Sequence, residues 1–85
     1  MTKEQDTYMN CLLSLMRSLI RNQYCNDSIE IVLNMLIVIP YNQREEAAKK
    51  FTEIAAQGLS EVDFHYEISQ VFKEIMGYDL TSDIN

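Results

Sequence analysis

The fold is decided by residues 29–39, which read IEIVLNMLIVI. Six of these eleven residues are β-branched, a composition that favours a strand. No second stretch of the sequence has this character, and a strand without a partner cannot satisfy its backbone hydrogen bonds. We therefore predict a helix here, apolar on nearly every side and central in the fold.

Turn-forming residues around this segment divide the chain into four helical segments. They are Asn26-Asp27-Ser28, Pro40, Gly58 and Gly77, and the whole chain contains only two Gly and one Pro. The predicted helices cover residues 3–23, 28–39, 43–57 and 61–76, and a polar tail covers 78–85. Short connections make consecutive helices antiparallel, so the sequence predicts an all-α fold, a small antiparallel four-helix bundle in one domain.

Three of the predicted helices begin with a capping signal. Asp27 with Glu30, and Asn42 with Glu45, have the spacing of a reciprocal N-terminal cap. Ser60 also precedes an acidic residue by three positions. These signals place the starts of the second, third and fourth helices.

The first helix has an unusually broad apolar face. At 100° per residue this arc contains Tyr8, Met9, Leu12, Leu13, Leu15, Met16, Leu19 and Ile20. A chain of 85 residues with 47% hydrophobic residues has little interior in which to bury them. It must either fill its own core efficiently or complete it against a second chain, so a homodimer through the first helix is one alternative.

The charge of the chain disfavours nucleic acid and favours a basic protein. It contains 7 Lys+Arg and 13 Asp+Glu, for a formal net charge of −6. Such a surface repels phosphate backbones, whereas it speeds and orients the approach of a basic partner. A DNA-binding regulator is a further alternative, and it would need a local basic patch made by Arg17, Arg21, Arg44, Lys49 and Lys50.

No constellation of catalytic or metal-binding residues is visible. His65 is the only histidine, and Cys11 and Cys25 lie on other segments, without the paired spacing of a zinc site. There is also no glycine-rich phosphate loop. We expect no cofactor, no metal and no catalytic residue, so the chain is interpreted as a protein that is not an enzyme, with His65 as a partly buried, hydrogen-bonded imidazole.

The location of the protein is inferred from three further features. Two cysteines are too few for a disulfide framework. The first six residues, MTKEQD, lack the basic-then-apolar order of a signal peptide, and the apolar run 29–39 is shorter than the roughly 20 residues that span a bilayer. These features predict a cytoplasmic protein without a membrane span.

Acidic residues and tyrosines outside the core pattern form the predicted binding surface. Between Glu61 and Asp83 there are six acids and a single Lys. Tyrosine is common at protein interfaces because it buries a large area at little entropic cost, although loop tyrosines also close the ends of bundles. The predicted partner-binding residues are Tyr41, Tyr66, Glu67, Glu74, Tyr78, Asp79 and Asp83.

In size, acidity and helical character the chain resembles bacterial toxin-immunity proteins and phage-encoded inhibitors of host defence. The resemblance involves no sequence motif. It implies an inhibitor that masks the functional surface of a protein partner, such as the basic surface of a nucleic-acid-handling protein. A homodimeric regulatory or structural protein is the alternative from another class.

Overall fold

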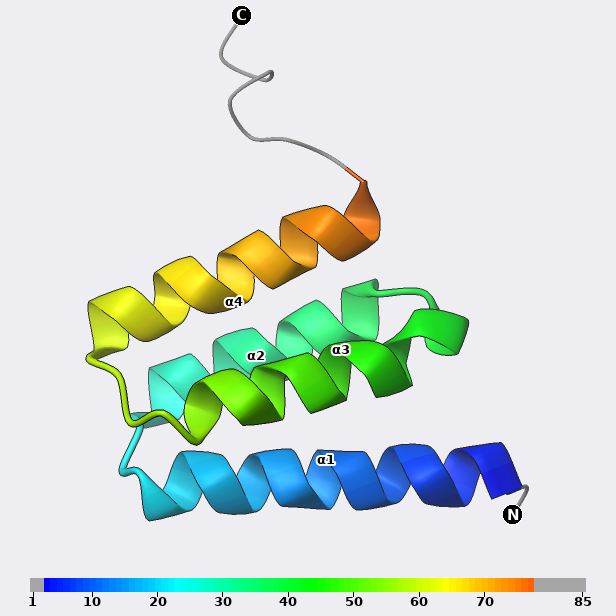
Figure 1. Ribbon diagram of the computed structural model, residues 1–85, viewed down its shortest axis with the longest axis horizontal. Helices are drawn as coiled ribbons and strands as arrows, with labels where there is room; N and C mark the ends of the chain where they lie inside the picture. Colours follow the sequence, from blue (N-terminus) through cyan, green and yellow to red (C-terminus); the bar gives the residue numbers. More distant parts are fainter. Residues whose placement is uncertain (1–2, 78–85) are drawn as a thin grey trace, which may run out of the picture.

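The computed structural model describes residues 3–77, except for the side chain of Glu4. These residues form four helices and no strand: α1 (Lys3–Arg21), α2 (Asn26–Val38), α3 (Tyr41–Ala55) and α4 (Glu61–Met76). Consecutive helices run in opposite directions (Figure 1). The predicted all-α antiparallel four-helix bundle is therefore confirmed. The predicted polar tail, 78–85, lies outside the described residues.

The helices are arranged in three layers. Figure 1 shows α1 on one side, α2 and α3 in the middle, and α4 on the other side. The connections α1–α2 and α3–α4 lie at one end of the bundle, and α2–α3 lies at the other. α3 packs against each of the other three helices, most extensively against α1.

The prediction that residues 29–39 form the central helix is therefore wrong. That position belongs to α3, whose Ala47, Ala48 and Ala55 are completely buried around Phe51. Small side chains let neighbouring helices approach closely, so α3 can accept neighbours on several sides. α2, by contrast, leaves Ile37 and Val38 more than half exposed near its C-terminal end.

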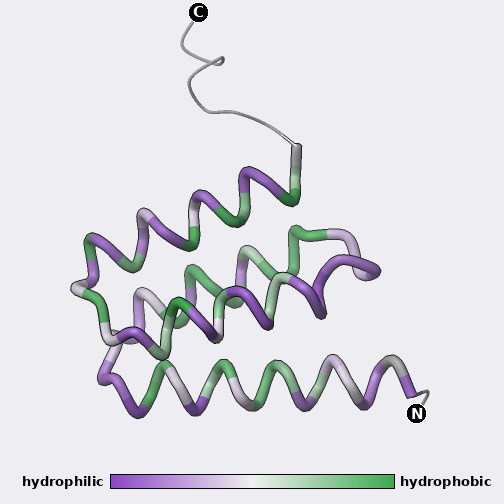
Figure 2. Tube along the Cα trace, viewed as in Figure 1, coloured by the Kyte–Doolittle hydropathy of each residue, from purple (hydrophilic) through white to green (hydrophobic). Residues whose placement is uncertain are grey.

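The core combines one apolar face from each helix. Figure 2 shows hydrophobic and hydrophilic residues alternating along α4 and α1, as expected for amphipathic helices. The buried apolar residues are Leu15, Leu19, Tyr24, Val32, Leu36, Ile39, Ala47, Ala48, Phe51, Ile54, Ala55, Phe64 and Ile68. Burial of these side chains provides the main stabilising free energy of the bundle.

Two of the predicted helix caps are not formed. α2 and α3 each begin two residues earlier than predicted, after Cys25 and Pro40, and neither of these residues makes a side-chain capping hydrogen bond. Asp27 and Asn42 thus lie inside their helices and are not caps. At the start of α2 the Glu61 carboxylate instead accepts a hydrogen bond from the Cys25 amide, and a local spacing rule does not include such a long-range contact.

Arg44, near the start of α3, makes a contact of another kind at the junction of α2 and α3. Its Nε donates to the carbonyl oxygen of Ile39 at 2.9 Å, and its Nη2 donates to that of Ile37 at 2.8 Å. The last carbonyls of a helix have no partner within the helix and carry partial negative charge. A guanidinium from the next helix therefore closes the C-terminal end of α2.

The start and end of α4 agree with the sequence prediction. The Ser60 hydroxyl accepts a hydrogen bond from the Asp63 amide at 3.2 Å, and Gly77 ends the helix with a φ of 79°. Gly58, before Ser60, has a φ of 66°. Such left-handed conformations have little steric cost for glycine, which explains its use at both points.

Candidate functional site

The outer face of α4 exposes two apolar side chains one turn apart. Phe64 and Ile68 are completely buried, and this fixes which side of the helix faces the core. On the opposite side Val62 is 77% exposed and Tyr66 is 63% exposed. An aliphatic and an aromatic side chain at i and i+4 together form a small apolar surface that solvent reaches freely.

Carboxylates border this apolar pair. Asp63 and Glu67 are exposed beside it, one turn apart, and Glu74 is exposed nearly two turns further along the helix. Among residues 3–77 none of the three forms an ion pair, and Lys73 is the only Lys or Arg on α4. We call Val62, Asp63, Tyr66, Glu67 and Glu74 the α4 face.

The structure places the predicted binding residues in two separate regions. Tyr66, Glu67 and Glu74 belong to the α4 face. Tyr41 begins α3 at the end of the bundle that contains the α2–α3 connection, where its ring and that of Tyr8 from α1 meet in a T-shaped contact. The remaining three predicted residues, Tyr78, Asp79 and Asp83, lie outside the described part of the chain.

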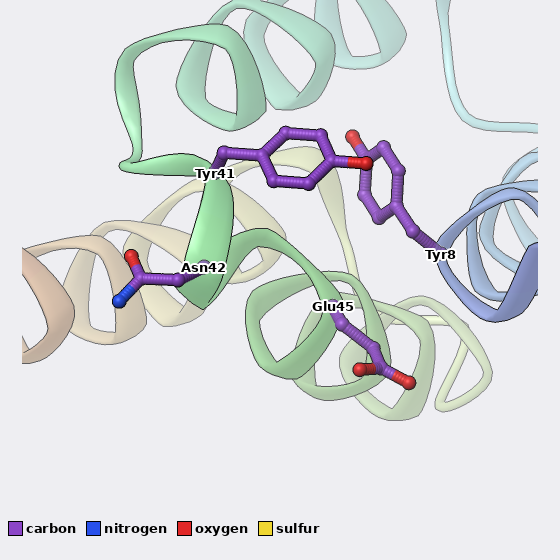
Figure 3. A pocket seen from close by; sticks show the side chains of 4 residues that line it. All are labelled: Tyr8, Tyr41, Asn42 and Glu45. Carbon is purple, nitrogen blue, oxygen red and sulfur yellow. The ribbon is translucent and has the colours of Figure 1, made fainter. Parts of the chain in front are cut away.

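Tyr41 lines a hollow of about 280 Å³ between α1 and the start of α3. Figure 3 shows its lining residues, Tyr8, Tyr41, Asn42 and Glu45. The two rings lie 6.1 Å apart at an interplanar angle of 61°, and the Arg44 guanidinium lies 5.6 Å from the centre of the Tyr41 ring. Burial raises the pKa of Tyr8, and the Arg44 charge partly offsets this effect. These contacts hold the Tyr41 ring at the junction of the helices, where it is 51% exposed.

A polar cluster that the sequence did not reveal joins the start of α2 to the start of α4. Ser28 is completely buried, and its hydroxyl forms a hydrogen bond to a Glu61 carboxylate oxygen. The same hydroxyl lies 2.8 Å from His65 Nε2 and 3.5 Å from Cys25 Sγ. The other Glu61 oxygen accepts from the Cys25 backbone amide at 3.0 Å. One carboxylate thus fixes the first turn of α2 against α4.

The geometry of this cluster suits a structural contact. The Ser28 hydroxyl is inaccessible to solvent, so a substrate has no path to it. Glu61 contacts the serine, whereas a catalytic triad needs the acid to orient the imidazole from its other nitrogen. His65 is half-buried and hydrogen-bonded, as the sequence predicted.

The hydrogen bonds to Glu61 also affect its titration. Donation from the Ser28 hydroxyl, and then from the Cys25 amide, lowers the pKa of the Glu61 carboxyl below its usual value. Donors that bind the ionised form stabilise it. Glu61 and His65 lie one turn apart on the same helix, a pair visible in the sequence, but Ser28 is 33 residues away and no spacing rule finds it.

Tyr24, in the α1–α2 connection, closes one end of the bundle. Its ring stacks on Phe64 with centroids 4.3 Å apart, and its hydroxyl oxygen accepts a hydrogen bond from the Leu59 amide at 2.8 Å. Burial raises its pKa. The possibility that a loop tyrosine fills a bundle end is confirmed at this position.

Three of the five basic residues considered for DNA binding have partners within residues 3–77. Lys49 and Lys50 are within 3.7 Å and 3.5 Å of Glu45 and Glu46, and Arg44 is held by carbonyl groups of the α2 segment. Of the five bases considered for DNA binding, only Arg17 and Arg21 lack a partner within residues 3–77. This arrangement does not favour the DNA-binding alternative.

No family model matches this chain, and neither a curated protein nor a solved structure matches it. Within residues 3–77, no three His, Cys, Asp or Glu side chains group closely enough to hold a metal ion. In the same part of the chain, every helix is too short or too polar to cross a membrane.

Proposed function

We propose that this chain is a protein-binding module that inhibits or neutralises a basic protein partner by covering that partner's functional surface with the α4 face. The observation that supports the proposal most strongly is the exposed Val62–Tyr66 pair beside carboxylates that form no ion pair within residues 3–77.

The apolar and charged parts of the α4 face have different roles in this proposal. Protein interfaces derive most of their affinity from a few buried side chains, among which tyrosine is common. Tyr66 is therefore the proposed anchor, with Val62 packing beside it. The carboxylates of Asp63, Glu67 and Glu74 orient a basic partner and exclude an acidic one, because rim charges act mainly on association rate and specificity.

The rigidity of α4 supports the same role. Phe64 and Ile68 fix one side of the helix in the core, and the Glu61 contacts to Ser28 and Cys25 fix its first turn. A preorganised face loses little conformational entropy when it binds. A catalytic role would instead require a cleft that holds a nucleophile beside a base.

The test compares two immobilised variants with equal changes of net charge. In the first, Glu67→Lys is combined with Glu74→Lys on the α4 face. In the matched control, Glu30→Lys on α2 is combined with Glu53→Lys on α3, where both residues are exposed. We expect the first variant to lose a protein that the wild-type chain retains from a host extract, whereas the control retains it. Tyr66→Ala should weaken retention without changing the net charge.

Inhibition is then measured on the retained protein. Its activity should fall as wild-type chain is added and should recover when the salt concentration is raised, because exposed charge pairs are screened. Equal retention by both charge variants would refute the α4 face as the binding site. A partner whose activity is unchanged at saturation would refute the inhibitory function.

A further inference from the structure

We propose that a second copy of this chain binds along α1, in an antiparallel arrangement, and that the resulting homodimer carries two α4 faces. The proposed interface is a row of apolar residues on α1, Met9, Leu13, Met16 and Ile20, here called the α1 stripe. This inference concerns a different surface from the α4 face and does not depend on its function.

The α1 stripe is apolar surface that the bundle leaves uncovered. Met9, Leu13 and Ile20 are 42%, 50% and 65% exposed, and Met16 is partly buried at the edge of the core. Leu15 and Leu19, which are completely buried, point to the core. At 100° per residue the stripe lies about 110° around the helix from these two leucines. α1 packs chiefly against α3, which leaves this flank free.

The spacing of the α1 stripe suits another helix. Its residues follow one another at intervals of four, three and four, which is the repeat of the apolar seam in a coiled coil. The pattern is also self-complementary. When two copies pair in opposite directions, Met9 of each faces Ile20 of the other, and Leu13 of each faces Met16 of the other, so four apolar layers form.

Charge favours the antiparallel direction. Asp6 lies near the N-terminal end of α1, and Arg17 and Arg21 lie near its C-terminal end, all exposed and on the same flank of the stripe. In an antiparallel pair the Asp6 carboxylate of one copy comes beside the Arg21 guanidinium of the other. A parallel pair instead places ends of like charge together. Lys3 extends past the paired region, since the opposing helix ends at Arg21.

The position of α1 determines what the dimer presents. α1 and α4 lie on opposite sides of the layer made by α2 and α3 (Figure 1). Because the α1 stripe lies to one side of the core-facing leucines, pairing through it leaves both α4 faces exposed. A partner with two equivalent sites, or an array of partners, would bind such a dimer more tightly than the monomer through its higher effective concentration.

The oligomeric state of the full chain provides the test. We expect sedimentation equilibrium at micromolar concentration to give twice the chain mass of 9.9 kDa. Leu13→Glu combined with Ile20→Glu should give the monomer mass with unchanged helicity, because both side chains are exposed. The matched control adds the same charge at Asn34→Glu and Gln57→Glu, which are exposed and lie outside α1, and should remain dimeric.

Direction is tested with single cysteines in a background that lacks Cys11 and Cys25. Chains with Met9→Cys should form a disulfide with chains that carry Ile20→Cys, and neither variant should cross-link with itself. A monomeric wild-type chain would overturn the proposal, because the α1 stripe would then be covered by something other than a second copy. So would a dimer that tolerates the stripe charges, or a cross-link between identical variants.

Discussion

α3 and α1 lie side by side and run in the same direction, but they differ in how much of their apolar surface is buried. In α3 the apolar stripe around Phe51 and the alanines is completely or almost completely buried. In α1 only Leu15 and Leu19 are completely buried, and Leu13 and Ile20 remain at least half exposed. Burial here depends on the number of neighbouring helices more than on the apolar content of the helix itself.

α3 acts as the scaffold of the bundle, whereas α1 and α4 provide its outer surfaces. α3 has neighbours on three sides, so each of its apolar residues stabilises the fold. α1 and α4 are outer helices, and their outward faces contribute little to stability. A large apolar side chain in such a position is either neutral or available for binding.

The largest expected effect is a loss of stability on substitution in the inner helix α3, compared with almost no loss on substitution in the outer helix α1. Phe51→Ala should lower the free energy of unfolding by about 3–5 kcal/mol, because it leaves a cavity among completely buried neighbours. Leu13→Ala should change it by less than about 0.5 kcal/mol under conditions where the chain is monomeric. Urea unfolding followed by circular dichroism measures both. Equal losses of unfolding free energy for the two variants would show that burial does not distinguish α1 from α3.

A smaller effect concerns how the outer helix α4 is attached. Ser28→Ala should lower the free energy of unfolding by about 1–2 kcal/mol, because it removes the hydroxyl that contacts both Glu61 and His65. The control Ser14→Ala, at an exposed position on α1, should have almost no effect. Thermal unfolding of the three proteins measures the difference. An unchanged midpoint for Ser28→Ala would mean that apolar contacts alone hold α4.

The smallest expected effect is a dependence on pH. The pKa of Glu61 is lowered in the folded chain, so its contribution to stability is present above the unfolded value and is lost as the pH falls through the folded value. The wild-type chain should therefore lose stability more steeply than Glu61→Gln below about pH 4.5. Urea midpoints measured at a series of pH values compare the two. Parallel curves would contradict the proposed role of this carboxylate.

Local patterns in the sequence predict part of this structure correctly. The lack of a second strand-like run predicts that residues 29–39 are helical, and Ser60 and Gly77 mark the ends of α4. These features depend on neighbours within a few residues. The antiparallel order follows from the short connections, because a short loop gives the next helix little choice of direction.

Features made by distant residues could not be predicted in the same way. α3 is central because it contacts all three other helices in the fold. Composition alone instead favours α2 as the central helix, because α2 is the more apolar of the two. The start of α2 and its C-terminal end are held by Glu61 and Arg44, which contact backbone groups of other segments. Tyr41 and Tyr66 are assigned to one binding surface from the sequence because both are tyrosines outside the core pattern. In the fold they lie on different helices, α3 and α4.

The most direct test of the proposed function is amide chemical-shift mapping of the labelled protein as the retained partner is added. We expect the largest changes on α4, at residues 62, 63, 66, 67 and 74, with little change on α3. Changes concentrated around Tyr8 and Tyr41, with α4 unaffected, would contradict this expectation.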